Sequence, residues 1–162
     1  MNTVHEDRKD RKERKERKEN HGFAASAAFA FIVYLVLTLA LTWPLARGLA
    51  HDVPSDFGDP LFTMWVMAWD ATHLGPGWWN ANIFHPHPLA LAYSEHFLPQ
   101  ALQALPVYLV TANPILGYNL VFLSTFVLSG LGMYLFTRDL TGRWESAMLA
   151  GLAYAFAPYR IA

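Results

Sequence analysis

Apolar residues in this chain gather in long blocks that are separated by polar segments. Residues 23–45 are apolar or small apart from two Thr and one Ser. As a helix they would extend over about 35 Å, which is enough to cross the hydrocarbon core of a bilayer. Residues 115–137 form a second block of this kind, and residues 144–160 form a third. The pattern predicts an all-α integral membrane protein, in which these spans form a multi-span helical bundle.

The segment 46–114, which joins the first two blocks, predicts a folded loop that contains helices. Asp59 followed by Pro60 is typical of a helix start with Asp59 as the N-cap, and the apolar pattern extends the helix to about Leu74. At ~100° per residue, its polar positions share one narrow arc. These positions are Asp59, Thr63, Asp70 and His73. Because the arc carries no Lys or Arg, unlike the polar face of a lipid-binding helix, we expect it to face a wet cavity inside the protein.

The second half of this segment has a different pattern. Residues 97–111 are apolar but too short for a span, so they predict an interfacial or re-entrant helix. Residues 80–96 predict an irregular loop, in which two Pro residues force extended geometry on His85 and His87. The Trp78–Trp79 pair is typical of a membrane interface, and the alternative is that it stacks on a sugar ring.

Basic residues are distributed unevenly. Eight of the twelve Lys and Arg lie at 8–18, and the 90 residues between Arg47 and Arg138 contain none. Membrane proteins keep basic residues in cytoplasmic segments, so this distribution predicts a cytoplasmic tail at 1–22 and an exported loop at 46–114. The predicted location is the inner (plasma) membrane, multi-pass, with a cytoplasmic N-terminus. The alternative for the first block is a cleaved signal peptide, since small residues stand at cleavage positions after it.

The tail is a low-complexity tract of bases and acids. It has no apolar stripe, so it predicts either a helix held by oppositely charged neighbours or a disordered segment. A basic cluster can bind nucleic acid or anionic lipid, but six acids dilute the eight bases here. We therefore expect a solvated tail that sets orientation, and no nucleic-acid partner.

The carboxylates just after the first block are the main candidates for chemistry. Asp56 and Asp59 lie about one helical turn apart. There a carboxylate can act as a base on an acceptor hydroxyl, or can bind a divalent cation such as Mg or Mn. For Asp59 the alternative role is the helix N-cap, and the two roles are compatible. These two residues are the candidate catalytic residues.

A metal site is a further candidate, built from Asp59, His85 and His87, with Glu95 and His96 as additional donors. The Pro residues direct the two His apart, and His side chains that hold loop backbone are the alternative. The chain has no Cys, which excludes a disulfide framework and a thiolate metal site. It also has no Gly-rich phosphate loop, nucleophile elbow or zinc motif, so a cytoplasmic nucleotide enzyme has no support.

Five short segments and their order carry a resemblance to a known superfamily. They are Thr42-Trp43-Pro44, Gly58-Asp59-Pro60, Tyr93-Ser94-Glu95-His96, Leu128 to Tyr134 and Tyr154 to Arg160. With a tail, one span, a large acidic outer loop and then closely spaced spans, residues 23–162 resemble the N-terminal part of the GT-C membrane glycosyltransferases. That superfamily includes oligosaccharyltransferases, protein O-mannosyltransferases and bacterial lipid-modifying sugar transferases.

The resemblance implies a transferase that moves a sugar from a polyprenyl-phosphate carrier to an acceptor on the outer face of the membrane, with inversion. Its implied partners are the lipid-linked sugar donor and membrane lipid. An acidic residue in the first outer loop assists the acceptor in that superfamily, and Asp59 matches it best, with Asp56 second. This chain departs from the pattern because its loop has, after Arg47, no Lys or Arg to neutralise the leaving phosphate. Arg160, a His, a metal on the acids or residues beyond Ala162 would have to do so.

Arg160 is a candidate in its own right, because an Arg at membrane depth on the expected outer side opposes the general charge distribution. Together with Asp70, Glu95 and His96 it forms the expected substrate-binding set. The apolar pattern continues to Ala162, which predicts the N-terminal piece of a longer protein, inactive by itself. The alternative function is a non-enzymatic membrane transporter or assembly subunit. A transporter would place ionisable residues at mid-bilayer, and the predicted spans have none there.

Overall fold

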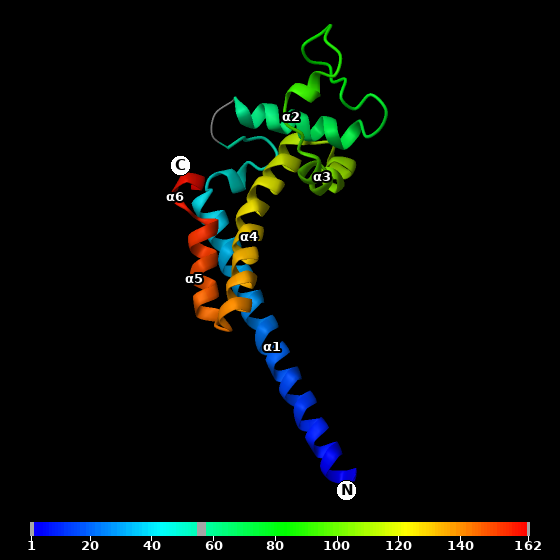
Figure 1. Ribbon diagram of the computed structural model, residues 1–162. Helices are drawn as coiled ribbons and strands as arrows, with labels where there is room; N and C mark the ends of the chain where they lie inside the picture. Colours follow the sequence, from blue (N-terminus) through cyan, green and yellow to red (C-terminus); the bar gives the residue numbers. More distant parts are fainter. Residues whose placement is uncertain (1, 55–57, 162) are drawn as a thin grey trace. The chain divides into compact units, whose positions relative to one another are not determined.

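The computed structural model describes residues 2–54 and 58–161, and every regular element in these ranges is helical. The elements in chain order are α1 (Asn2–Leu41), η1 (Leu45–Arg47), α2 (Asp59–Thr72), η2 (Ala90–Tyr93), α3 (Leu98–Thr111), α4 (Pro114–Thr141), α5 (Trp144–Ala155) and α6 (Pro158–Ile161). They divide into two compact units (Figure 1). The loop unit comprises residues 42–125, and the helix unit comprises the described residues up to 41 and from 126 onward. The all-α fold class is confirmed.

Two described helices are long and apolar enough to cross a membrane, His21–Leu41 within α1 and Pro114–Thr141, which is α4. Apolar side chains on both helices are exposed, among them Phe29, Ile32 and Phe136. An apolar surface of this kind is expected of a helix whose solvent is lipid. These helices confirm the first two predicted blocks, although α1 ends at Leu41, four residues earlier than expected.

Two expectations about helix ends are corrected by the structure, and one open alternative is decided. The third block is not one helix, because α5 ends at Ala155 and a short α6 follows. With 12 residues, α5 is about 18 Å long, which is shorter than a bilayer core. The second block ends at residue 137, whereas α4 continues to Thr141 and has Arg138 in its last turn. Of the two alternatives for the tail, the structure shows helix, because α1 is continuous from Asn2.

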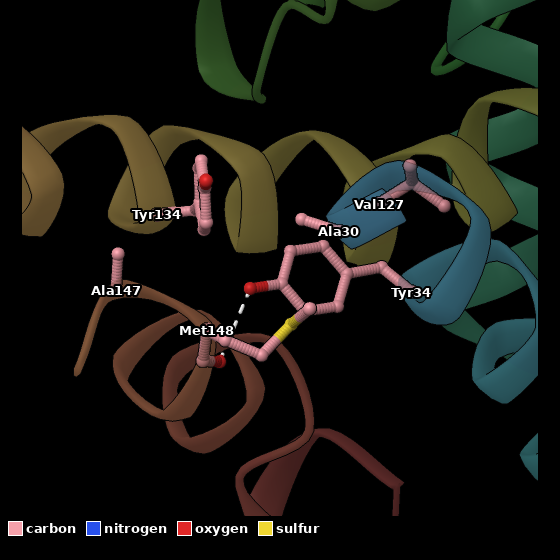
Figure 2. Close-up of a cluster of buried hydrophobic side chains, with 6 residues drawn as sticks. All are labelled: Ala30, Tyr34, Val127, Tyr134, Ala147 and Met148. Carbon is pink, nitrogen blue, oxygen red and sulfur yellow. Dashed lines mark hydrogen bonds between the residues drawn. The ribbon is translucent and has the colours of Figure 1, made fainter. Parts of the chain in front are cut away.

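The helix unit packs around Tyr34, which is fully buried (Figure 2). Its hydroxyl donates to the carbonyl of Met148 at 3.2 Å. The buried cluster brings together parts of α1, α4 and α5. Its members are Ala30, Tyr34, Val127, Tyr134, Ala147 and Met148. Tyrosine suits this position because its ring fills the core while its hydroxyl has a backbone hydrogen-bond partner.

Glycines make room for the Tyr34 ring. A Cβ built on Gly130 would lie 3.0 Å from the ring and 3.2 Å from the Cβ of Ala155. A Cβ on Gly151 would overlap the Tyr34 hydroxyl. Close contact through a small residue of α4 therefore occurs at Gly130. It does not extend to Gly132, where a Cβ would meet nothing within 4 Å.

The loop unit is built on α2 and α3, which confirm the two helices predicted between the spans and lie side by side (Figure 1). Met67 of α2 and Ala104 of α3 share a buried cluster with Val121 at the start of α4. Val66 on α2 belongs to a second cluster with Ala81 and Leu91. That these helices lie at a membrane interface stays a prediction.

Candidate functional site

Asp70 is the centre of the polar contacts in the loop unit. It lies on α2 and is fully buried. One carboxylate oxygen accepts from the Trp78 indole N–H at 2.7 Å and contacts His96 Nδ1 at 3.0 Å. The other accepts from the backbone N–H of Phe97 at 3.1 Å. Three donors therefore surround a carboxylate that would be costly to bury without them.

The turn that follows α2 brings Trp78 back to Asp70. Gly75 and Gly77 have φ of 151° and 91°, a region that a Cβ disfavours. They shape the turn after α2, in which the Trp78 N–H donates to the Gly75 carbonyl at 3.1 Å. The Trp69 indole donates to the carbonyl of Trp78 at 2.9 Å. The turn thus returns Trp78 to the helix that carries Asp70.

His96 packs between two indoles. Its ring centroid lies 4.8 Å from that of Trp78 and 4.2 Å from that of Trp79, and both ring pairs meet edge to face. Such edge-to-face pairs are favourable because the positive edge of one ring meets the negative face of the other. His96 therefore links the buried carboxylate to an indole, that of Trp79, which remains 43% exposed.

The Asp70–His96 pair has the arrangement in which a carboxylate orients an imidazole. An ionised carboxylate only accepts, so Nδ1 carries the hydrogen and Nε2 is left as the second nitrogen. Nε2 is buried and has no hydrogen-bond partner within the described ranges. A general base must come within reach of its proton, and Nε2 is covered in this conformation. The pair is arranged to hold the surrounding loop rather than to touch a substrate.

Asp59 stands in a different setting. It is exposed and is the first residue of α2, while Gly58 is the N-cap. The prediction that Asp59 caps this helix is therefore wrong, and Pro60 takes the second helical position instead of the first. The reason is that α2 begins one residue earlier than the Asp-Pro pattern suggests. A carboxylate in the first turn still interacts favourably with the helix dipole, and its oxygens face solvent. Asp56 lies outside the described residues.

The remaining loop candidates do not converge. Glu95, His85 and His87 are exposed. No group of three or more His, Asp or Glu that could hold a metal ion occurs in the part of the chain that the structure describes. Mg and Mn need several oxygen donors around one point, so the described donors do not fit such an ion. The metal role of Asp59, His85 and His87 therefore has no donor set here.

Arg160 belongs to the helix unit. Its guanidinium donates to Ser129 Oγ at 2.7 Å and to the Ala155 carbonyl at 3.2 Å, near the C-terminal end of α5. Its Cζ lies 4.8 Å from the ring centroid of Phe126. A cation beside the last carbonyls of a helix satisfies them and opposes the negative end of the dipole. These contacts give Arg160 a packing role, and its binding of substrate stays a prediction.

Asn119 was not singled out in the sequence, and Trp78 was noted only as half of an aromatic pair, although both organise the loop unit. Asn119 is fully buried, and its amide donates to the carbonyls of Leu49 and Asp52 at 2.8 and 2.7 Å. A lone Asn in an apolar block, and one Trp of a pair, are weak signals. Their partners lie many residues away, so local spacing does not reveal them.

The comparisons with known proteins add no relative. None of the protein-family models, curated proteins or solved structures with which the chain was compared matches it. The function must therefore be argued from the residues and contacts described above.

Proposed function

We propose that this chain is the N-terminal part of a membrane glycosyltransferase. It moves a sugar from a polyprenyl-phosphate carrier to an acceptor hydroxyl at the outer face of the membrane. The observation that supports this best is the exposed Asp59 at the start of α2, inside a folded segment between two helices long enough to cross a bilayer. That segment contains carboxylates, and no Lys or Arg lies between Arg47 and Arg138.

In this proposal Asp59 is the base. It takes the proton of the acceptor hydroxyl while the hydroxyl oxygen forms a bond to C1 of the sugar. The bond between C1 and the phosphate oxygen breaks, and the polyprenyl phosphate leaves with that electron pair. An exposed carboxylate can reach an acceptor, whereas the buried Asp70 cannot, so the two acids have different roles. The groups that neutralise the leaving phosphate are expected elsewhere, because residues 48–137 contain no Lys or Arg.

The test uses the full-length protein in membranes, with a labelled polyprenyl-phosphate hexose as donor. Asp59→Asn removes the base but keeps the size of the side chain. We expect a fall in kcat of about a hundredfold or more, the usual contribution of a positioned base. Asp139→Asn is the matched control, because Asp139 is also an exposed Asp on a helix. Its rate should be unchanged.

Two results would contradict the proposal. If Asp59→Asn transfers sugar as fast as the unmodified protein, Asp59 has no part in the mechanism. If the full-length protein transfers sugar from none of the polyprenyl-phosphate donors offered, a non-enzymatic membrane component becomes the better account.

A further inference from the structure

Trp79 combines exposure with a fixed position. Its side chain is 43% exposed, yet its ring lies against His96 at 4.2 Å and Trp78 at 5.7 Å. Its backbone carbonyl accepts from the Leu91 N–H at 3.0 Å. The loop around Trp79 is fixed as well, because the side-chain oxygen of Asn80 accepts from the Leu89 N–H at 2.7 Å. An exposed indole held in this way has little rotamer freedom left to lose on binding.

The support for Trp79 comes from Asp70. The buried carboxylate holds His96 through Nδ1 and Trp78 through its indole N–H. Both of these rings contact Trp79. The contacts that hold the loop therefore also reach a ring that is partly open to solvent. Asp70 and His96 are therefore positioning residues for Trp79.

Trp79 and the acid that precedes His96 in the sequence restrict what can bind there. Glu95 is exposed and precedes His96, the residue that packs on the indole. A carboxylate accepts hydrogen bonds from hydroxyl groups, and an indole face packs against the C–H face of a sugar ring. Residues 48–137 contain no Lys or Arg, and an indole and a carboxylate offer a phosphate no opposite charge.

We propose that Trp79 and Glu95 form a carbohydrate-binding subsite, in which the indole stacks on a neutral or amino sugar and the carboxylate accepts its hydroxyls. This subsite adds a sugar-binding role to the proposed function. It depends on that proposal only for the statement that the bound sugar belongs to a donor or an acceptor. The phosphate of a carrier lies outside it.

The test is sugar binding by the full-length protein in phosphatidylethanolamine–phosphatidylglycerol vesicles, prepared without sugar-based detergent. The ligands are methyl glycosides of hexoses, hexosamines and N-acetylhexosamines, followed by saturation-transfer NMR. Trp79→Ala should weaken binding at least tenfold, and Trp79→Phe should keep binding within about threefold, because a smaller aromatic face still stacks. Glu95→Gln, a change at an exposed position, should weaken binding severalfold without affecting the fold.

Trp144 provides the matched control. It is also 43% exposed and is followed by Glu145, but it lies in the helix unit at the start of α5. Trp144→Ala should leave sugar binding unchanged. Equal losses from Trp79→Ala and Trp144→Ala would overturn the subsite, as would the absence of saturable binding to any of the glycosides. Strong quenching of Trp79 fluorescence by brominated lipid, with no protection by sugar, would also overturn it and would make Trp79 a membrane anchor.

The subsite and the catalytic proposal can fail separately. Asp59→Asn should keep sugar binding while it loses transfer. If Trp79-dependent binding holds and transfer does not depend on Asp59, the proposed mechanism fails and the subsite stands. If transfer depends on Asp59 while Trp79→Ala binds sugar normally, the subsite fails and the transferase stands.

Discussion

The two units of this chain bury different kinds of polar group. In the helix unit these are hydroxyls: the Thr38 hydroxyl donates to the carbonyl of Tyr34 on the same helix, and the Tyr34 hydroxyl donates to the carbonyl of Met148. In the loop unit they are a carboxylate and an amide: Asp70 binds groups that lie 8 to 27 residues away, and Asn119 binds carbonyls that lie 67 and 70 residues away. Asp70 and Asn119 therefore each join several groups of the loop.

The difference follows from what surrounds the backbone. A helix satisfies its own N–H and C=O groups, so a spanning segment needs only apolar side chains and small residues at its contacts. An irregular loop has no such ladder, and its polar backbone groups need side-chain partners when they are buried. Asp70 and Asn119 provide these partners, which is why polar residues occupy the centre of the loop unit.

The largest effect is expected at Asp70. Asp70→Ala leaves three donors without their acceptor, and we expect a loss of about 3–5 kcal/mol in the stability of the loop unit. The direct readout is hydrogen exchange at the Phe97 amide, which donates to Asp70 and should exchange much faster in the variant. Asp139→Ala, at an exposed position, should change neither measurement. Unchanged protection of the Phe97 amide would show that the network does not hold the loop.

A smaller loss is expected from Gly151→Ala in the helix unit. The added methyl group would overlap the Tyr34 hydroxyl, and overpacking of this kind costs about 1–3 kcal/mol. The measurement is the Tm of the full-length protein in detergent. Gly132→Ala is the internal comparison, because nothing lies within 4 Å of that position. It should leave the Tm unchanged or raise it, since Ala favours helix over Gly. Equal effects at both glycines would mean that the Tyr34 packing is not as described.

The smallest effect is expected at Tyr108 on α3. Its buried hydroxyl has no hydrogen-bond partner among the described residues, so Tyr108→Phe should change stability by no more than about 1 kcal/mol. Burial raises the pKa of Tyr108 to about 12 from 10.0. The unfolded chain therefore loses this proton first, and stability contributed by Tyr108 is lost as pH rises from about 10 towards 12.

The comparison at alkaline pH is between the unmodified protein and Tyr108→Phe. The variant should lose less stability over that window in denaturant unfolding followed by fluorescence. An identical decline in both proteins would mean that Tyr108 is not buried in the folded loop unit.

The same contrast explains what could be predicted from the sequence. The helix unit was largely predictable, because the apolar blocks at 23–45 and 115–137 are local patterns. Its errors concern ends: the third block breaks after Ala155, and α4 runs to Thr141. A helix end depends on caps and tertiary contacts, which periodicity alone does not record.

The loop unit was predictable in its helices but not in its contacts. The Asp-Pro pair located the start of α2 to within one residue, and the apolar run located α3. The arc on α2 grouped Asp70 with Asp59, yet the structure buries the first and exposes the second. Asp70 contacts His96 and Trp78 because of the turns between them, and residue spacing does not predict the geometry of those turns. The shared role of the three residues is therefore visible only in the fold.

The central claim is that the loop between the two span-capable helices faces outward while the charged tail faces the cytoplasm. Because the chain has no Cys, single-cysteine variants can be labelled uniquely in intact cells with a membrane-impermeant maleimide. Tyr93→Cys, at a position that is 84% exposed, should be labelled from outside. Arg14→Cys, at an exposed position in the tail, should be labelled only after the cells are permeabilised. Protection of Tyr93→Cys in intact cells, or labelling of Arg14→Cys from outside, would contradict the account.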